Sequence, residues 1–375
     1  MIGGGQLARM TQQAAISLGV GFRVLAASPH DSAAQVVAGL DLGRHDDEEA
    51  VVRFASRCDV VTFDHEHVPQ HILKRLEREG TVVRPGSRAL EHAQDKIRMR
   101  QALSDIGVPC PQWRQVEQVD EVVDFASQTG WPVVLKASRG GYDGRGVWVV
   151  DDAQTAGEVL SQPLSAPGAQ WLAEQFVGFD QEVAAQVARS PHGQAVAYPV
   201  VRTVQTQGIC TEVVAPCPDL DPDLAVSAQQ IALRIAGELG VIGMLAVELF
   251  VVDGGVLVNE LAMRPHNSGH WSIHGAVTSQ FENHLRAVLD LPLGDPTARA
   301  GSSVMVNVLG GRDPDLYPAY RHVQARDPRV HLHMYGKEVR PGRKIGHVTV
   351  VGDDLADLRS RARHAADYLS GSIDE

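Results

Sequence analysis

The sequence predicts a multidomain chain that combines α/β and α+β architecture. A Rossmann-like parallel α/β domain is expected first, then a larger central domain and a small β-rich C-terminal domain. Three observations support this: 375 residues exceed one ordinary core, strands alternate with helices early in the chain, and later strands pair through glycine turns. We place the domains at residues 1–94, 95–290 and 291–375.

The composition and net charge argue against a membrane-spanning protein and against a nucleic-acid-binding protein. The chain is 44% hydrophobic and 21% charged, and it has no apolar run of the roughly eighteen residues that a membrane span needs. A net charge of −12 without a long basic run argues against a nucleic-acid partner. The four cysteines lack metal-ligand spacing. We expect a cytoplasmic protein with reduced thiols, no membrane association and small-molecule substrates.

A glycine motif opens the chain. Gly3, Gly5 and Ala8 fit G-x-G-x-x-G/A before a predicted helix that ends at Gly19. A glycine turn before a helix offers backbone N–H groups to an anion. A dinucleotide-dependent oxidoreductase is one alternative, but the following strand ends in Ser28 rather than in the acidic ribose partner.

The strand that should precede this motif has only Met1 and Ile2 available. Either the sheet lacks most of its first strand, or the chain starts inside a longer coding sequence, and we expect the second. Further strands are predicted at 60–63 and 81–85.

The segment FDHEHVP, residues 63–69, follows a predicted strand, where α/β sheets bind ligands. We expect Glu66 to accept a hydrogen bond from a substrate. A metal site made by the adjacent His and Glu residues is the weaker alternative, because neighbouring side chains alternate in direction.

The central domain begins with a predicted helix at 95–109, with Met99, Leu103 and Ile106 on one face. Lys96 lies in its first turn, the unfavourable end for a cation in the helix dipole. Such a cation often meets an external anion, although a solvated surface is equally common.

A strand, a glycine-rich loop and a returning strand follow at 133–136, 140–146 and 147–150. The arrangement resembles the glycine-rich lid of kinases, whose N–H groups close over nucleotide phosphates, and Lys136 would add a cation. A flexible hairpin is the alternative. The loop carries functional groups that favour the ligand interpretation, namely Tyr142, Asp143 and Arg145.

WLAEQFV, residues 171–177, predicts a strand that turns into a second strand from Glu182. Such a segment can serve as a nucleotide hinge, with backbone groups for adenine and Glu182 for the ribose.

The region 244–270 predicts a β-hairpin around Asp253-Gly254-Gly255. If these three residues form the turn, Val252 closes it with Val256 and Phe250 faces Val258. Glu248 then faces Glu260 on the same side of the sheet.

Like charges directly opposite each other destabilise an antiparallel pair. A hard divalent cation removes the repulsion, and Mg²⁺ commonly takes one or two carboxylates plus substrate phosphates. Glu248 and Glu260 are therefore candidate metal ligands, with Asn259 as a further oxygen donor. A solvated pair at a hairpin mouth is the alternative.

The C-terminal domain predicts a strand at 302–310, a hairpin at 331–352 and a closing helix. Leu355, Leu358, Ala362 and Ala365 give the helix one apolar face. The hairpin places four cations around Pro341-Gly342: Lys337, Arg340, Arg343 and Lys344. We expect them to bind a sugar phosphate, with a solvated basic loop as the alternative.

These features occur in the order of an ATP-grasp ligase. The strings GGGQLARM, KASRGGYDGRGVW, NELAMRPHNSGHW and YGKEVRPGRKIGHV resemble the N5-carboxyaminoimidazole ribonucleotide synthase family, from residue 3 to about residue 352. The resemblance implies an ATP-grasp fold behind a biotin carboxylase-like N-terminal domain. Met263 departs from the family, which usually has proline there, and this change affects loop rigidity but removes no catalytic group.

The resemblance implies ATP-dependent carboxylation of 5-aminoimidazole ribonucleotide with bicarbonate, through carboxyphosphate, in purine biosynthesis. The implied cofactors are ATP and Mg²⁺, with Mn²⁺ as a substitute. A homodimer and a pathway partner, carboxyaminoimidazole ribonucleotide mutase, are also implied.

It further assigns residues. ATP would be bound by Lys96, Lys136, Gly141, Tyr142, Asp143, Gly144, Arg145, Gly146, Val147, Glu174, Gln175, Phe176, Val177, Glu182, Gln205, Asn259 and Glu260. The ribonucleotide would be bound by Gly5, Gln6, Glu66, Tyr142, Arg145, Lys337, Arg340, Arg343 and Lys344.

The implied catalytic residues are Asp143, Arg264, His266 and Asn267. Asp143 would orient or deprotonate the amine, and the other three would hold bicarbonate or carboxyphosphate. A structural role is the alternative for His266, and His270 and Trp271 are expected to pack.

Two alternatives remain within or near this superfamily. One is a ligase with another substrate, such as formate-dependent glycinamide ribonucleotide transformylase. The other is a silent nucleotide-binding regulator, which is disfavoured because every expected carboxylate and lysine is present.

Overall fold

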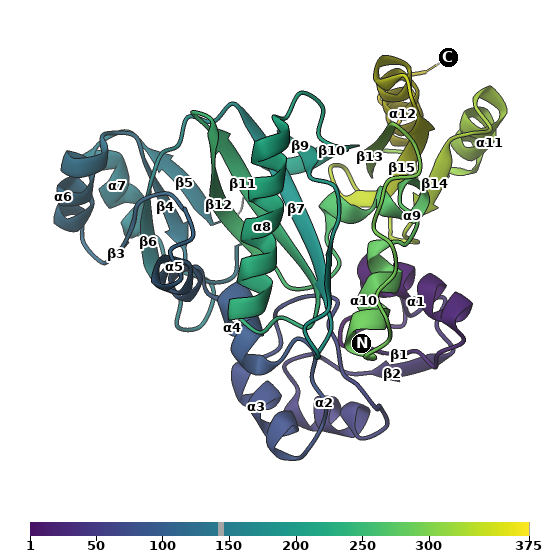
Figure 1. The fold of residues 1–375 in the computed structure, drawn as a ribbon, viewed down its shortest axis with the longest axis horizontal. Coiled ribbons are helices and arrows are strands. Elements are labelled where there is room, and N and C mark those ends of the chain that lie inside the picture. Colours follow the sequence, from purple (N-terminus) through teal and green to yellow (C-terminus); the bar gives the residue numbers. More distant parts are fainter. Residues whose placement is uncertain (142–145, 375) are drawn as a thin grey trace.

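The computed structural model describes residues 1–141 and 146–374, and within them the strands form three sheets (Figure 1). A two-stranded parallel sheet lies in the N-terminal part and a four-stranded antiparallel sheet in the central part. A nine-stranded sheet runs from the central part into the C-terminal part. This is the mixed α/β and α+β architecture that the sequence predicts.

The N-terminal part contains α1 (Gln6–Leu18), β1 (Arg23–Ala26), β2 (Gly39–Leu42), α2 (Glu48–Ala55), α3 (Gln70–Arg78) and α4 (Ser87–Gln94). The predicted strands at 60–63 and 81–85 are wrong as full strands, because they are reduced to the parallel bridges Ile2–Phe63 and Val61–Val83. Pro85 has no amide donor with which to extend the second bridge. The first strand is likewise a bridge at Ile2, and β2 was not predicted.

The central part begins with α5 (Lys96–Asp105), β3 (Trp113–Val116), α6 (Val119–Thr129), β4 (Val133–Ala137), β5 (Val147–Val150), α7 (Ala153–Leu160) and β6 (Trp171–Gln175). The strand order is β3-β6-β4-β5, and we call this the lid sheet. Phe125 of α6 and Val159 of α7 pack in one core with Leu135 and Ala173 of the sheet. The two helices therefore hold β4 and β5 on either side of the glycine-rich loop.

The remaining elements are β7 (Gln181–Arg189), β8 (Ala195–Ala197), β9 (Val201–Thr206), β10 (Ile209–Ala215), α8 (Pro222–Glu238), β11 (Gly243–Val252), β12 (Gly255–Ala262), α9 (Ser272–Gly275), α10 (Gln280–Val288), β13 (Ser302–Leu309), α11 (Tyr317–Arg326), β14 (His331–Met334), β15 (Lys344–Gly352) and α12 (Leu355–Ser370). The strand order of the large sheet is β12-β11-β7-β9-β10-β13-β15-β14, with β8 paired to β7. Because β13 pairs with β10, the sheet crosses the expected boundary at residue 290. The three domain boundaries stay predictions.

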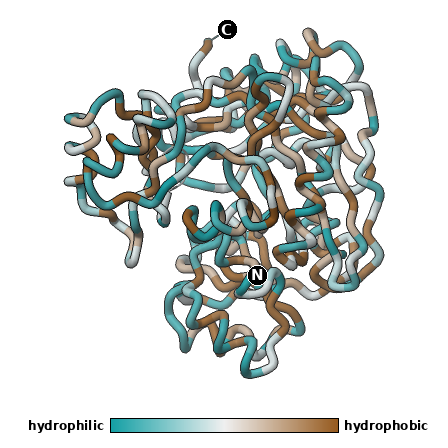
Figure 2. The backbone as a smooth tube through the Cα atoms, turned by 60° about the vertical axis from the view of Figure 1, so that its left-hand side comes forward, coloured by the Kyte–Doolittle hydropathy of each residue, from teal (hydrophilic) through white to brown (hydrophobic). Residues whose placement is uncertain are grey.

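The interior is formed by residues of both strands and helices, and Figure 2 shows hydrophobic stretches of the chain running through it. One core cluster joins Ile2 and Phe63 of the N-terminal part to Leu245 and Val258 of the large sheet. The closing helix α12 buries Leu358, Ala362 and Ala365 as predicted, while Leu355 is only half-buried. Across the described ranges, no helix has both the length and the apolar character required to cross a bilayer.

Candidate active site

The hairpin of β11 and β12, which we call the carboxylate hairpin, places Glu248 directly opposite Glu260, as predicted. The route to this pairing differs from the predicted one. The turn has two residues, Asp253 and Gly254, with positive φ angles of 47° and 73°, so Val252 pairs with Gly255. This geometry suits a tight hairpin turn.

A register shift next to Glu248 brings Glu248 and Glu260 into the same pair despite the shorter turn. Leu249 pairs with Val258, so one extra residue, Asn259, is inserted in β12 before Glu260. The predicted pairs Val252–Val256 and Phe250–Val258 are therefore wrong. The two-residue turn displaces the register in one direction, and the β-bulge displaces it back.

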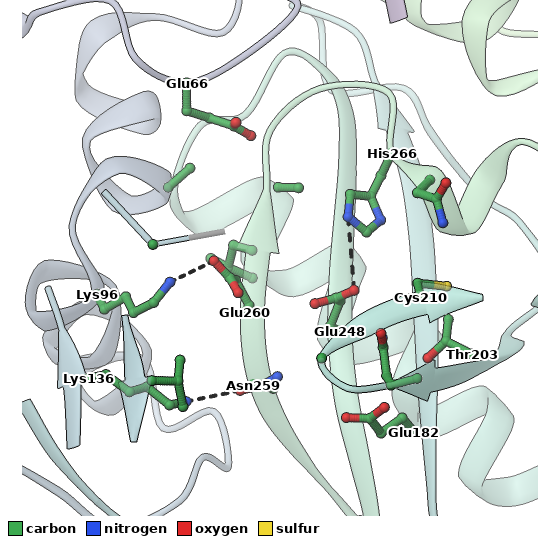
Figure 3. Close-up of a pocket in the computed structure, with 18 of the residues that line it drawn as sticks. Glu66, Lys96, Lys136, Glu182, Thr203, Cys210, Glu248, Asn259, Glu260 and His266 are labelled. Carbon is green, nitrogen blue, oxygen red and sulfur yellow. Dashed lines mark hydrogen bonds and ion pairs between the residues drawn. The ribbon is translucent and has the colours of Figure 1, made fainter. Parts of the chain in front are cut away.

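The bulge also explains why Asn259 and Glu260, which are consecutive, both line the same cleft. Figure 3 shows the two side chains facing lysines from different elements. Nζ of Lys96 lies 2.7 Å from Oε1 of Glu260, and Nζ of Lys136 lies 3.2 Å from Oδ1 of Asn259. The cation at the unfavourable end of α5 thus meets a carboxylate of the hairpin.

The two opposed carboxylates have different protonation equilibria. Removal from solvent raises the pKa of Glu248 to about 7, and the charges of Glu260 and Glu182 contribute to the rise. Removal from solvent also opposes ionisation of Glu260, but the ammonium of Lys96 outweighs it and lowers the pKa of Glu260. The hairpin therefore presents one ionised carboxylate and one that is only partly ionised at neutral pH.

A cleft of about 1800 Å³ lies between the lid sheet, the carboxylate hairpin and the N-terminal part. It is lined by most of the residues that the sequence indicates: Gln6, Glu66, Lys96, Lys136, Gly141, Val147, Glu174, Gln175, Phe176, Val177, Glu182, Gln205, Glu248, Asn259, Glu260, Arg264, His266, Asn267 and Lys344. Tyr142, Asp143, Gly144 and Arg145 lie outside the described residues. Gly146, at the end of the loop, is described but is not part of the lining.

The hinge segment forms one wall of the cleft. Gln175, Phe176 and Val177 line the cleft, as does Glu182, whose pKa is raised by burial. The carboxylate of Glu174 is buried and bonds to Nζ of Lys136 at 2.6 Å. Its side chain therefore orients a lysine of the lid sheet.

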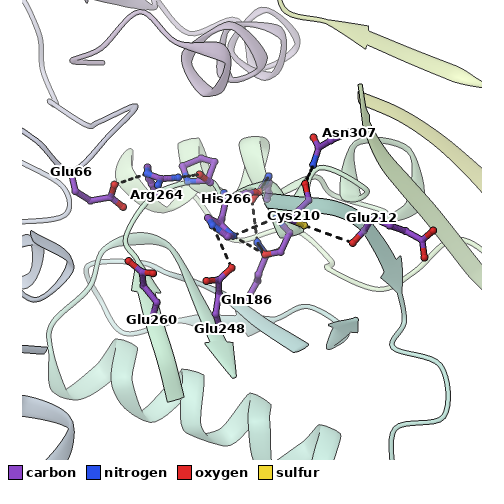
Figure 4. A network of polar contacts seen from close by, with 12 residues as sticks. Glu66, Gln186, Cys210, Glu212, Glu248, Glu260, Arg264, His266 and Asn307 are labelled. Atoms are coloured by element: carbon purple, nitrogen blue, oxygen red, sulfur yellow. Dashed lines mark hydrogen bonds and ion pairs between the residues drawn. The ribbon is translucent and has the colours of Figure 1, made fainter. Parts of the chain in front are cut away.

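The loop after β12 carries Arg264, His266 and Asn267 into the same cleft, and Figure 4 shows its polar contacts. Arg264 donates from Nε to Oε2 of Glu66 at 2.7 Å. His266 Nδ1 is 2.9 Å from Oγ of Ser268, and its Nε2 is 3.9 Å from Oε1 of Glu248. Burial, with the charges of Arg264 and Lys344, lowers the pKa of His266 to about 3, so this imidazole is neutral.

Several polar atoms in and around the cleft are buried without a hydrogen-bond partner among the described residues, and two of them are Oε1 of Glu66 and Nδ2 of Asn267. One is an acceptor and the other is a donor. Since unpaired buried polar groups are costly, these atoms mark positions where a bound molecule would complete the bonding.

The four predicted cations of the C-terminal hairpin are not equivalent. Lys344 lines the cleft, whereas Arg340 is exposed and donates to Glu338. Arg343 donates to the backbone oxygen of Glu338, and Lys337 lies over the ring of Tyr335. Within the described residues, the structure thus brings one of the four to the cleft.

The glycine turn before α1 is already bonded within the chain. The carboxylate of Asp64 accepts from the amides of Gly5 and Ala8, both at 2.8 Å. Gln6 lines the cleft, whereas Gly5 does not. The role of Gly5 in substrate binding stays a prediction.

Two functional candidates escaped the sequence analysis. Gln280 of α10 accepts from the backbone nitrogen of His266 at 2.9 Å and donates to its oxygen at 2.8 Å. Arg100 of α5 is fully buried against the hinge and the hairpin. Neither position carries a local signal, because both act through tertiary contacts. His270 and Trp271 are buried, as expected for packing residues.

The comparison with known proteins decides the family. A relative from Mycobacterium bovis, an N5-carboxyaminoimidazole ribonucleotide synthase, is 52% identical over 374 residues, covering 99% of this chain and 87% of the relative. The chain belongs to the N5-carboxyaminoimidazole ribonucleotide synthase family. It is an ATP-grasp ligase, and the reaction of its family is the ATP-dependent carboxylation of 5-aminoimidazole ribonucleotide in purine biosynthesis.

Family models and solved structures agree. An ATP-grasp domain matches residues 101–281, a ribonucleotide synthetase preATP-grasp domain matches residues 1–94, and a phosphoribosylaminoimidazole carboxylase C-terminal domain matches residues 303–361. The N5-carboxyaminoimidazole ribonucleotide synthetase from Thermus thermophilus is 39% identical with a TM-score of 0.87, covering 100% of this chain and 99% of that chain. The synthase from Aspergillus clavatus in complex with ADP and 5-aminoimidazole ribonucleotide is 30% identical with a TM-score of 0.89, covering 99% and 98%.

Met263, the departure from the family pattern, is fully buried in the core cluster that joins the N-terminal part to the large sheet. An unbranched thioether fills such a space without a hydrogen-bonding requirement.

Proposed function

We propose that the cleft binds ATP, bicarbonate and 5-aminoimidazole ribonucleotide side by side, with the carboxylate hairpin at the centre. The observation that supports this most strongly is the pairing of Glu248 with Glu260 beside Lys96 and Lys136. Phosphoryl transfer depends mainly on positioning and on stabilising charge, and this group of side chains supplies both.

The residues of the hairpin fit a hard divalent cation. Glu248, Glu260 and Asn259 offer oxygen donors. Burial is the main cause of the raised pKa of Glu248, and a dication would offset the further contribution from the charges of Glu260 and Glu182. We assign Mg²⁺ to these three residues, with Mn²⁺ as a substitute. The ion would shield the phosphate oxygens of ATP from the carboxylates and neutralise charge during transfer.

The nucleotide is assigned to the lid sheet and the hinge. Backbone groups at 174–177 face adenine, Glu182 binds the ribose, and Lys96 and Lys136 bind phosphates. Gln205 is assigned to the nucleotide because it lines the same wall. The residues from Gly141 to Val147 are assigned to the phosphates on the basis of the sequence motif alone, and residues 142–145 among them lie outside the described part of the chain.

Arg264, His266 and Asn267 are assigned to bicarbonate. A bicarbonate oxygen attacks the γ-phosphorus, the bond to ADP breaks, and carboxyphosphate forms. Arg264 binds the anion, and Nδ2 of Asn267 donates the hydrogen bond that it lacks within the described chain. His266 is neutral and therefore acts as a hydrogen-bonding group.

The ribonucleotide is assigned to the side of the cleft formed by Gln6, Glu66 and Lys344. Its exocyclic amine attacks the carboxyl carbon, phosphate leaves, and the amine loses a proton. Asp143 is assigned to orient or deprotonate this amine from the sequence motif. Gly5, Tyr142, Arg145, Lys337 and Arg343 complete the assignment made from the family resemblance, whereas Arg340, which donates to Glu338, is expected to contribute little.

We also propose that the chain works as a homodimer in the cytoplasm and passes its product to carboxyaminoimidazole ribonucleotide mutase. These assignments come from the family and its pathway. Light scattering during size-exclusion chromatography measures the first of them, and a monomer at micromolar concentration would contradict it.

Phosphate release tests the proposed reaction. Release with Mg·ATP should require both bicarbonate and 5-aminoimidazole ribonucleotide. Formate with glycinamide ribonucleotide should give no release above background. Release that depends on formate, or that ignores bicarbonate, would overturn the proposal.

A further inference from the structure

A buried arginine connects the two parts of the cleft that hold the nucleotide. Arg100 lies on α5, one turn after Lys96, and its side chain is fully buried. Nε donates to Oε1 of Glu174 on the lid sheet at 2.7 Å. Nη1 and Nη2 donate to the backbone oxygens of Val258 and Asn259 on the carboxylate hairpin, at 3.0 Å and 2.8 Å.

The hairpin needs these donors because β12 is the edge strand of the large sheet, so the carbonyl groups on its outer side have no neighbouring strand to bond. Buried carbonyl groups that have no ladder partner require other donors. Val258 and Asn259 lie on this strand, at the bulge. The planar fork of a guanidinium can reach both carbonyls and a carboxylate at once, which the single ammonium of lysine cannot do.

Arg100 also sets the local charge. Glu174 bonds to Arg100 and to Lys136, so two cations share one carboxylate. The excess positive charge is available to phosphate groups in the cleft. Without Arg100, Glu174 and Lys136 would form a neutral pair, and the group would carry no excess positive charge toward the phosphates of a nucleotide.

We propose that Arg100 is a positioning residue that fixes the spacing between Lys136 on the lid sheet and Asn259–Glu260 on the hairpin, and thereby sets the affinity for Mg·ATP. The inference rests on the proposed placement of the nucleotide between these two elements. Arg100 itself lies behind the cleft and is not part of its lining.

The test compares Arg100→Met and Arg100→Lys with the wild type by calorimetry with a non-hydrolysable ATP analogue and Mg²⁺. The dissociation constant should rise about tenfold in Arg100→Met, since one charge-assisted bond is worth at least that factor. It should rise by roughly half as much on a logarithmic scale in Arg100→Lys, which keeps the charge. The KM for 5-aminoimidazole ribonucleotide should stay within about twofold of the wild-type value, because Arg100 bonds to the lid sheet and the carboxylate hairpin and not to the residues assigned to the ribonucleotide.

Arg98→Lys is the matched control, because Arg98 lies on the same helix, is exposed and pairs with Glu91. Its analogue affinity should equal that of the wild type. The half-saturating Mg²⁺ concentration should increase in both Arg100 variants and not in the control. If Arg100→Met does not fold, Arg100→Lys decides the outcome.

An unchanged dissociation constant in a folded Arg100 variant, or an equal loss in Arg98→Lys, would overturn the inference. Failure of the proposed reaction is a separate result. It would leave analogue binding intact in the wild type while phosphate release did not respond to bicarbonate and the ribonucleotide.

Discussion

Two regions of this chain present charge-binding groups beside the same cleft, and they differ in how those groups are compensated. At the start of α1, the amides of Gly5 and Ala8 are bonded to the carboxylate of Asp64. At the carboxylate hairpin, Glu260 pairs with Lys96, whereas Glu248 lies near a neutral imidazole and retains a pKa of about 7.

This difference indicates which of the two regions still has charge that a ligand could compensate. At the glycine turn, the amides of Gly5 and Ala8 are already bonded to Asp64, so these two amides do not depend on a bound anion for a hydrogen-bond partner. At the hairpin, burial and the charges of Glu260 and Glu182 oppose ionisation of Glu248, so the described residues do not fully compensate this carboxylate. Both sequence patterns predict a ligand-binding site, but only the folded structure shows which of their polar groups are already bonded within the protein.

The largest expected effect separates the two regions directly. Glu260→Gln should reduce ATP turnover at least about a hundredfold, because it removes a metal ligand and the partner of Lys96. The fold should remain intact by circular dichroism. Asp253→Asn, at the turn of the same hairpin, is the control, and turnover close to wild type in Glu260→Gln would remove the metal assignment.

The next test compares two cations of the C-terminal hairpin. Lys344 lines the cleft, while Arg340 is held by Glu338. Lys344→Met should raise the KM for 5-aminoimidazole ribonucleotide about 30-fold, and Arg340→Met no more than about twofold. Steady-state kinetics at saturating ATP measures the KM of both variants. An equal increase in the two would contradict the prediction that the ion pair with Glu338 keeps Arg340 from contributing to substrate binding.

The pH dependence of metal binding sharpens the comparison further. Protons compete with the metal for Glu248, whose pKa is about 7 in the metal-free chain. Affinity for Mg²⁺ should therefore be nearly constant above pH 8 and fall about tenfold between pH 8 and pH 6. Calorimetric titration at the two pH values measures the change. In Glu248→Gln the affinity should be weaker and should not change over this interval, and a parallel fall in the variant would contradict the assignment.

The smallest expected effect is a loss of stability at the start of α1, where Asp64 accepts the amide hydrogen bonds. Asp64→Asn keeps one acceptor oxygen and should lose one amide bond, which destabilises the chain by about 1–2 kcal/mol. Thermal unfolding should show a lower midpoint than in the wild type and in the exposed control Asp59→Asn. An unchanged midpoint would show that α1 does not depend on this cap.

The sequence predicted the pairing of Glu248 with Glu260 because two errors cancelled: the expected turn was one residue too long, and the bulge in β12 restored the count. It missed the bulge at Asn259 and the two-residue turn, because a single inserted residue leaves no compositional trace. The pairing of Val133–Ala137 with Val147–Val150 followed from the glycine loop between them, whereas the place of β6 between β3 and β4 was not predicted. Arg100 and Gln280 could not be predicted, since their partners lie far away in the chain and their burial comes from tertiary packing.

The N-terminal part shows the same limit. The helix ending at Gly19 was predicted from its C-terminal glycine, and α1 ends there with Gly19 in the left-handed region. The residues 60–63 and 81–85 have strand-like composition but form single bridges, because parallel pairing depends on neighbours distant in sequence.

The central claim is that Glu248 and Glu260 hold one divalent cation between them. Electron paramagnetic resonance of Mn²⁺ titrated into the ADP-bound protein tests it most directly. The wild type should bind Mn²⁺ tightly, and the double variant Glu248→Gln/Glu260→Gln should bind it at least about a hundredfold more weakly. Equal Mn²⁺ affinity in the folded double variant would contradict the account.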